Sequence, residues 1–312
     1  MKTLTFNAMG SRIFIAIDTD NDSVVTEALK AQQWFDSWED SLSRFRITSE
    51  LSQVNQHPGS RRLVSPVFQE VMKAAENAEK LSGGLVTPRV LNALIAAGYK
   101  DDFESLLEKT GKAFETALIS PPEPGKVEFD PGEGTIEIPF GTQLDFGGIA
   151  KGWAAHQVMK RLGELAPVLV DAGGDVAISS PRLDKSEWPV GVANPFDKDN
   201  NLALIMAGEG GIATSGKDYH RWMLNGEMQH HIIDPRTLRP AATDIFTATI
   251  LASNVMDAET YAKTALILGS EYGKSWLDDQ HAIGYLLVLD DGSIYKNDIF
   301  MKYEWKQEWQ IN

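Results

Sequence analysis

"LDFGGIAKGWAAHQVMKRLGELAPVLVDAGGDVAISS" fills residues 144–180 and holds three structural signals in one run. A glycine pair comes first, a segment typical of a helix follows from Lys151 to Leu165, and an apolar run typical of a strand comes next. Strand and helix patterns interleave without regular alternation in the rest of the chain as well. This order favours an α+β fold with a mainly antiparallel sheet over a doubly wound parallel fold.

The residues before this stretch predict one strand, two long helices and a hairpin. Alternation over Thr5–Asp18 indicates a strand, and apolar recurrence over 23–45 indicates an amphipathic helix that ends near Phe45. A second helix is expected over 68–84, where two glycines form its C-terminal stop. The proline and glycine pattern of residues 119–148 predicts a loop and a hairpin.

The residues after it predict further strands, one more helix and a closing hairpin. The strands are expected in "NLALIMAGEG", "MQHHIIDP" and "FTATILAS", the helix in "AETYAKTALILGS" and the hairpin in "GYLLVLDDGSIYK". No internal repeat or low-complexity tract interrupts this order. We therefore expect a single domain over residues 1–312, with two lobes that meet at a seam near residues 118–143.

Composition excludes several classes of function. A formal net charge of -15 argues against a nucleic acid as the main partner, because that binding depends on clustered Lys and Arg. The chain has no cysteine, which excludes disulfides, thiolate metal sites and cysteine nucleophiles. No apolar run approaches the roughly 20 residues that span a bilayer, so no membrane insertion is expected. The first residues lack a secretory leader pattern, and we expect a cytoplasmic protein.

Two glycine pairs are candidate ligand contacts. Gly147 and Gly148 lack side chains where the chain turns from strand to helix, and Lys151 follows in the first helical turn, where free N–H groups favour an anion. This combination suits a diphosphate, and a plain structural turn with a solvated lysine is the alternative. Gly173 and Gly174 interrupt an apolar run, which is typical of a bulge.

"GIATSGKD" matches a nucleotide-binding P-loop except at its last position. Asp218 stands where a Ser or Thr would bind magnesium, so a nucleotide triphosphatase is not expected. The turn at Thr214, Ser215 and Gly216 still offers hydroxyl and N–H donors to a ligand.

Two further patterns offer polar side chains to a site. His230 and His231 are neighbours on a predicted strand and should point to opposite faces, so they cannot easily share one metal. Asp257, Thr260 and Thr264 are spaced to share one helical face, where their oxygens could hold a hard cation. Asp257 also suits a helix N-cap, which is a purely structural alternative.

Together these motifs resemble one family over nearly the whole chain, the ApbE-like FAD:protein FMN transferases. The motifs "NAMGS", "SRFRITSELSQVN", "GLVTP", "LDFGGIAKGWAA", "VDAGGD", "IATSGKDYHRW", "HHIIDPRT" and "AKTALILG" are similar to the signatures of that family, in the same order. The resemblance implies an α+β fold with a T-fold-like core that binds FAD and Mg²⁺. It also implies transfer of FMN to a threonine of a target flavoprotein, with release of AMP. A protein that binds FAD without turnover is the alternative function.

The resemblance also implies roles for individual residues. The cofactor-binding positions are Met9, Phe45, Thr87, Asp145, Lys151, Gly173, Gly174, Asp175, Thr214, Ser215, Gly216 and Ile233. The metal positions are the Gly148 carbonyl, Thr260, Thr264 and Asp257. His231 and Lys151 are the catalytic candidates: the histidine would orient or deprotonate the target threonine, and the lysine would offset diphosphate charge.

The chain departs from the resembled pattern at its last motif. A family aspartate falls on Thr260, and a further frequent acidic position falls on Lys263. A hydroxyl in place of a carboxylate removes one ligand charge, and a lysine adds the opposite charge, so metal affinity should fall. Asp257 and Glu259 are the neighbouring carboxylates that could compensate. "GLVTP" also lacks the acidic residue that many relatives carry at Val86.

Overall fold

One eight-stranded antiparallel sheet forms the centre of the structure, a computed structural model that describes residues 1–101, 120–280 and 283–306. Its strands follow the order β1-β2-β6-β7-β10-β15-β16-β17. They are β1 (Lys2–Ala8), β2 (Ser11–Ile17), β6 (Val168–Ala172), β7 (Asp175–Ile178), β10 (Gly210–Gly216), β15 (Ile245–Ala252), β16 (Gly284–Leu289) and β17 (Ile294–Lys296). The predicted α+β class with a mainly antiparallel sheet is confirmed.

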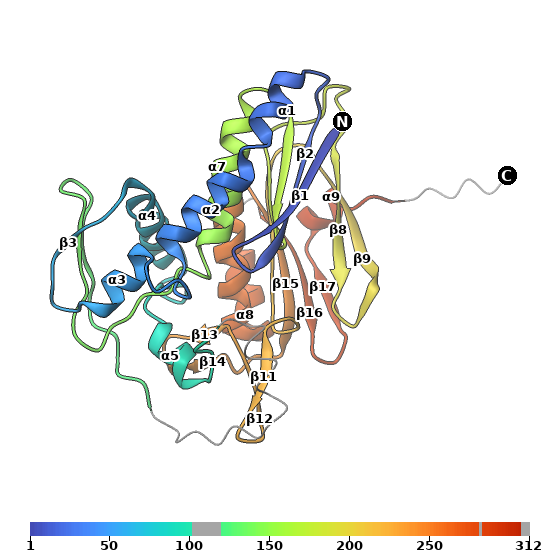
Figure 1. Cartoon of the computed structure of the whole chain (residues 1–312). Helices are drawn as coiled ribbons and strands as arrows, with labels where there is room; N and C mark the ends of the chain where they lie inside the picture. Colours follow the sequence, from blue (N-terminus) through green and yellow to red (C-terminus); the bar gives the residue numbers. More distant parts are fainter. Residues whose placement is uncertain (102–119, 281–282, 307–312) are drawn as a thin grey trace.

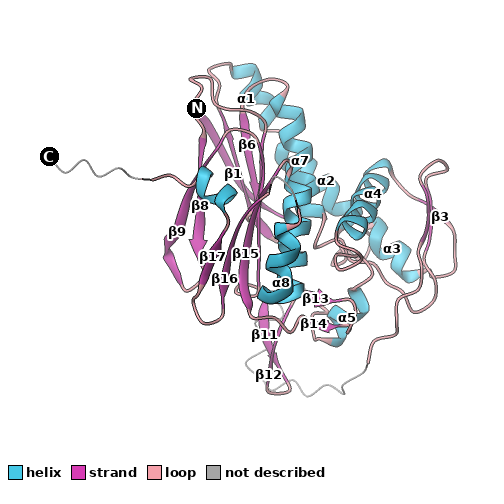
Figure 2. Cartoon of the chain, turned by 180° about the vertical axis from the view of Figure 1, so that it is seen from behind, coloured by secondary structure: helices cyan, strands magenta, loops and turns pink. Residues whose placement is uncertain are grey.

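Helices cover one face of this sheet and a hairpin covers the other (Figures 1 and 2). The helix layer contains α1 (Asp22–Ala28), α2 (Ala31–Leu42), α7 (Ala150–Gly163) and α8 (Val255–Asp278), and α4 (Pro66–Leu81) packs beside it. On the opposite face lie β8 (Trp188–Asn194), β9 (Asp197–Ala207) and α9 (Asp298–Tyr303). The sheet is therefore buried on both faces.

A small sheet and two short hairpins lie on the same side of the main sheet as the helices. A separate three-stranded sheet contains β3 (Arg62–Leu63), β5 (Thr135–Glu137) and β4 (Glu128–Asp130), next to α3 (Glu50–Gln56) in Figure 2. Two short hairpins lie near α5 (Leu91–Ala96) and are formed by β11 (Arg221–Leu224) with β12 (Glu227–His230), and by β13 (Ile233–Asp234) with β14 (Arg239–Pro240). The seam predicted near residues 118–143 falls partly outside the described residues and stays a prediction.

The alternation of side chains along β2 explains how the central sheet packs between the helix layer and the β8–β9 hairpin. Ile13, Ile15 and Ile17 of β2 face the helices and pack in one cluster with Trp153 of α7. Ala16 lies between them in sequence and packs on the other face, in the cluster that contains Trp188 of β8. Successive strand residues point to opposite faces, and each face of β2 therefore meets its own apolar partner layer.

Two predicted elements are wrong in the same way, because in each a tight turn interrupts residues whose pattern predicts one continuous strand. The strand expected over Thr5–Asp18 is the β1–β2 hairpin, whose turn residues Met9 and Gly10 have φ of 50° and 67°. The bulge expected at Gly173 and Gly174 is the turn between β6 and β7, with φ of 70° and 97°. Positive φ at both central residues is what a two-residue hairpin requires.

The helix predictions are confirmed at α4, α7 and α8 and corrected near the N-terminus. The single helix expected over 23–45 is divided into α1 and α2 at Leu29 and Lys30, and it ends at Leu42 rather than near Phe45. Among the described residues, no helix is both long enough and apolar enough to cross a bilayer.

Candidate functional site

A buried aspartate fixes the turn that leads into α7. Asp145 Oδ1 accepts a hydrogen bond from Gly147 N at 2.8 Å, and Asp145 Oδ2 lies 2.8 Å from Arg44 Nε. The backbone N–H of Asp145 donates to Pro88 O at 2.8 Å. Both carboxylate oxygens are thus used within the chain, and Asp145 shapes the turn; its predicted contact with FAD stays a prediction.

The first turn of α7 has no side-chain cap, although the N–H of Ala150 donates to Phe146 O at 2.8 Å and the carboxylate of Glu259 lies against Gly152. The N-cap residue, Ile149, makes no side-chain cap hydrogen bond, so the helix dipole and first-turn N–H groups have no internal acceptor from that side chain. Lys151 is half-buried, and its Nζ donates to Gly147 O at 3.2 Å. A positive charge therefore lies directly at the glycine turn.

The second glycine turn lies against the same lysine. A Cβ atom added to Gly173 would lie 4.0 Å from Lys151 Cδ and 2.7 Å from Ser11 Oγ, so no larger residue fits there. The turn is tied internally by Gly174 N, which donates to Asp171 Oδ1 at 2.8 Å. The structure thus brings together the two glycine pairs that are far apart in the sequence, with Lys151 between them.

Two carboxyl groups, those of Asp171 and Asp175, flank the second glycine turn. Burial and the charge of Glu259 raise the pKa of Asp175 to about 7, although Lys151 and Lys263 act in the opposite direction. Burial also raises the pKa of Asp171. Asp175 is consequently part-protonated near neutral pH, and the site carries less negative charge than its count of acidic residues suggests.

The two neighbouring histidines have different partners, but only His230 lies on a strand. β12 ends at His230 and His231 follows in a bend, so the single strand predicted over residues 228–235 is wrong. His230 Nε2 lies 3.1 Å from Ala241 O. The ring of His231 meets the ring of His220 edge to face, with centroids 4.9 Å apart. Burial lowers the pKa of His220 to about 4, and it lowers the pKa of His231 well below its usual value, helped by the charges of His220 and Lys151. His231 is therefore neutral near pH 7 and less basic than its residue type suggests. Its Nδ1 lies 3.4 Å from His220 O, a contact in which Nδ1–H is the donor and which leaves Nε2 as the proton acceptor.

The P-loop-like segment is a strand, which excludes a phosphate-binding loop there. Residues 210–216 form β10, and Thr214 Oγ1 lies 2.9 Å from Thr249 Oγ1 of β15. Lys217 donates through Nζ to Thr243 O at 2.5 Å and to Asp290 Oδ2 at 2.8 Å. Ser215 is buried within the strand. The expectation that this chain is not a nucleotide triphosphatase of the P-loop type fits this geometry.

A series of rings runs from the end of α2 to β11. Phe45 is half-exposed, and Arg44 Cζ lies 4.1 Å above the centre of its ring. Tyr99 follows, with its ring centroid 6.0 Å from Phe45 and 6.3 Å from His220. Aromatic surfaces of this kind suit a flat ring system. Phe45 was predicted as a flavin contact; Tyr99 was not singled out, because no motif marks it and only the fold brings it here.

Three other residues predicted to bind the cofactor make contacts within the chain. The backbone N–H of Met9 donates to Glu39 Oε1 at 2.7 Å. Thr87 Oγ1 is hydrogen-bonded to the carboxylate of Glu79. Ile233 is buried in the apolar cluster that contains Trp222. None of these contacts tests the predicted flavin contacts, which stay predictions.

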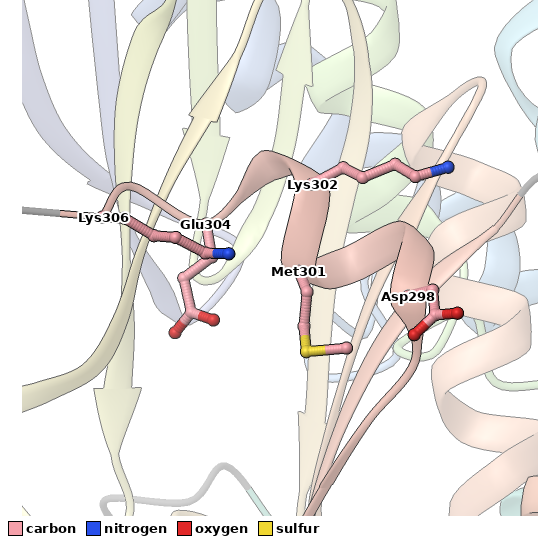
Figure 3. Close-up of a pocket in the computed structure, with 5 residues that line it drawn as sticks. All are labelled: Asp298, Met301, Lys302, Glu304 and Lys306. Atoms are coloured by element: carbon pink, nitrogen blue, oxygen red, sulfur yellow. The ribbon is translucent and has the colours of Figure 1, made fainter.

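A separate open hollow of about 500 Å³ lies beside α9, on the other face of the sheet (Figure 3). It is lined by Asp298, Met301, Lys302, Glu304 and Lys306. None of the predicted site residues lines it, so it is distinct from the two glycine turns.

Comparison with known proteins decides the family. The ApbE family model matches residues 9–287. The chain belongs to the ApbE family. It is 32% identical over 162 residues to a FAD:protein FMN transferase of Treponema pallidum, a match that covers 48% of this chain and 45% of that protein. It is 26% identical to a FAD:protein FMN transferase of Vibrio cholerae, over 81% of this chain and 77% of that protein.

The fold agrees with this membership. The crystal structure of the ApbE protein from Thermotoga maritima matches with a TM-score of 0.81 and 25% identity, over 98% of this chain and 99% of that one. The ApbE family match includes both glycine turns, β10, His231 and all of α8. The candidate site therefore lies inside the region that defines the family.

The side chains predicted as metal ligands each make a contact within the chain. Thr260 Oγ1 donates to Met256 O at 2.9 Å, and Thr264 Oγ1 donates to Thr260 O at 2.8 Å, so both hydroxyls bond back along α8. Asp257 is not the N-cap that its residue type suggests: Asn254 is the N-cap of α8 and accepts from the Asp257 N–H at 2.9 Å, while Asp257 Oδ2 accepts from Asn254 Nδ2 at 2.7 Å. Of the two nearby carboxylates, Glu259 points to α7, where its Oε2 is in contact with the Cβ position of Gly152.

These donors do not fit a magnesium ion. Mg²⁺ prefers an octahedron of oxygens with one or two carboxylates, but the carboxylate that reaches α7 is paired with an ammonium: Lys263 Nζ lies 2.8 Å from Glu259 Oε1. Within residues 1–101, 120–280 and 283–306, no group of three imidazole or carboxylate side chains is placed to share an ion. The predicted magnesium site stays a prediction that the donor chemistry does not support.

Proposed function

We propose that this chain is a FAD:protein FMN transferase, which moves FMN from FAD to a threonine of a target flavoprotein and releases AMP. The observation that carries the proposal is the meeting of two glycine turns, an uncapped helix N-terminus and Lys151 at one place. The names of the ApbE relatives support the same reaction. The threonine acceptor and the cytoplasmic setting both stay predictions.

The chemistry is a phosphoryl-type substitution at the flavin-side phosphorus of FAD. The threonine oxygen forms a bond to that phosphorus, the bond from the phosphorus to the bridging oxygen breaks, and the bridging oxygen leaves with AMP. The hydroxyl proton passes to neutral His231, which has a lone pair available. Lys151 and the first-turn N–H groups of α7 stabilise the charge on the diphosphate, and positioning supplies most of the catalysis.

Mass spectrometry tests the reaction directly. A pool of threonine-containing peptides is incubated with FAD and the protein, and each peptide is paired with a copy in which valine replaces the threonine. We expect threonine peptides to gain the mass of FMN and equal amounts of AMP to appear, with the valine copies unchanged. Tight FAD binding without any modified peptide or AMP would support the alternative, a protein that binds FAD without turnover.

Ligand preference provides an independent measurement. We expect calorimetry to show tighter binding of FAD than of ATP, because the ring series offers a surface to the flavin ring in addition to the charge that Lys151 offers to the diphosphate, and because β10 is not a P-loop. Binding of ATP without binding of FAD would contradict the proposed function.

Lys151→Ala should weaken FAD more than riboflavin. The lysine lies at the turn proposed for the diphosphate, and riboflavin has no phosphate, so the Kd of FAD should rise roughly tenfold, which is about 1.4 kcal/mol, while the Kd of riboflavin stays nearly constant. Lys160→Ala is the matched control, because Lys160 is exposed in the last turn of the same helix. Equal losses for both ligands would place Lys151 away from the phosphates.

A further inference from the structure

The side chain of Lys263 lies across the glycine turn at the start of α7. A Cβ atom added to Gly148 would lie 3.2 Å from Lys263 Cε, so the lysine stem packs directly on this glycine. The ammonium forms an ion pair with Glu259, in which Nζ lies 2.8 Å from Oε1. The Lys263 side chain is 14% exposed and the Glu259 side chain is 3% exposed. Lys263 therefore holds a positive charge at the turn in the folded chain.

Lys151 of α7 reaches the same turn. Its Nζ donates to Gly147 O at 3.2 Å, next to the glycine that Lys263 covers. Both lysine charges lower the pKa of His231 and both oppose the rise in the pKa of Asp175, so both act on the same buried groups. The two lysine side chains thus converge on one turn and form a single positive centre there, in which Glu259 offsets part of the charge of Lys263.

This centre competes with a divalent cation. A cation bound to the Gly148 carbonyl would lie at the residue on which the Lys263 side chain packs, and like charges a few ångströms apart repel strongly in a partly buried site. An ammonium also supplies what a diphosphate needs from a cation, a compact positive charge with several N–H donors.

We infer that the ammonium of Lys263 takes the place of a divalent cation, so that Lys151 and Lys263 together neutralise the diphosphate of FAD without a metal. The inference rests on the proposed function for the identity of FAD as the ligand. The lysine pair itself is a site for a diphosphate anion, whichever molecule carries it.

FAD titrations with a chelator test the inference. In the wild-type protein, the Kd of FAD should differ by less than about threefold between EDTA and excess Mg²⁺. Lys263→Met keeps the length of the side chain and removes its charge, and it should raise the Kd in EDTA by about tenfold or more. Lys274→Met is the matched control on the exposed surface of α8 and should bind as the wild type does.

The same variant should acquire a response to magnesium. Without Lys263, the carboxylate of Glu259 loses its partner and becomes an oxygen ligand for a cation, so Mg²⁺ should recover most of the lost FAD affinity. The double variant Lys263→Met with Glu259→Gln keeps the charge balance and should fold even if the single variant does not. It should lose FAD affinity in EDTA without recovery by Mg²⁺.

Pyrophosphate, as a second probe, separates failure of this inference from failure of the proposed function. Binding of FAD by the wild-type protein only with Mg²⁺, or an unchanged Kd of Lys263→Met in EDTA, would overturn the inference and leave the transferase proposal intact. Binding of pyrophosphate in EDTA that depends on Lys263, together with no binding of FAD, would support the lysine pair and overturn the proposed flavin chemistry.

Discussion

Replacing Arg44 by methionine should lower the free energy of unfolding by about 3–5 kcal/mol, because it leaves a buried carboxylate without its partner. Arg44 Nε lies 2.8 Å from Asp145 Oδ2, and the two side chains are only 6% and 10% exposed. The guanidinium also donates to Tyr99 O at 3.0 Å and to Lys100 O at 3.1 Å. The substitution thus removes a charge partner and two backbone contacts at once.

Urea unfolding of three variants checks this expectation. Arg61→Met breaks an exposed ion pair with Glu128, in which the Arg61 side chain is 54% exposed and the Glu128 side chain is 66% exposed. It should lower the free energy of unfolding by less than about 1 kcal/mol. Arg44→Met with Asp145→Asn should lose less stability than Arg44→Met alone, since the neutral amide needs no ionic partner. A loss for Arg44→Met as small as that for Arg61→Met would contradict the assigned role of the pair.

Asp175→Asn should stabilise the protein at alkaline pH and have little effect at acidic pH. Folding raises the pKa of this carboxyl from 3.8 to about 7, chiefly through burial and then through the charge of Glu259. The folded state therefore holds a proton that the unfolded chain has released. The stability from this group is complete below the unfolded pKa and is lost as the pH rises through the folded pKa, at a cost of at most roughly 4 kcal/mol.

The measurement compares the free energy of unfolding of both proteins at about pH 5 and about pH 8. Asparagine cannot ionise, so the gain of the variant over the wild type should be roughly 2–4 kcal/mol larger at the higher pH. Asp184→Asn is the control, because that exposed carboxyl has a lowered pKa and should give no such gain. The same gain for Asp175→Asn at both pH values would show that burial does not hold the proton there.

The sequence predicted the parts of the site that depend on local patterns. A glycine pair followed by Lys151 and an amphipathic segment specifies a turn, a charge and a helix within a few residues, and α7 begins where this pattern places it. The β6–β7 turn was located correctly but taken for a bulge, because a glycine pair in an apolar run suits both and only the pairing of the strands distinguishes them.

Contacts between distant segments could not be predicted in this way. Arg44 meets Asp145 because α2 and α7 pack on the same face of the sheet, and no spacing in the sequence relates the two residues. Residue type alone showed that Lys263 and Thr260 depart from the family pattern. Only the packing of α8 on α7 shows that Lys263 crosses Gly148 and that Glu259, rather than Asp257, reaches the turn.

The order of strands in the main sheet constrains how a nascent chain can fold. Ile15 of β2 pairs with Val170 of β6, so the helices α1 to α5 and the whole of α7 lie within one connection between neighbouring strands. During synthesis the residues of β1 and β2 leave the ribosome long before those of β6, and closure of so long a loop is slow. Until then β2 presents an open hydrogen-bonding edge lined by three buried isoleucines, which is a template for pairing with another chain. Synthesis of this protein therefore has a period of vulnerability to aggregation that ends only when the "VLVDA" segment arrives to cover the N-terminal hairpin.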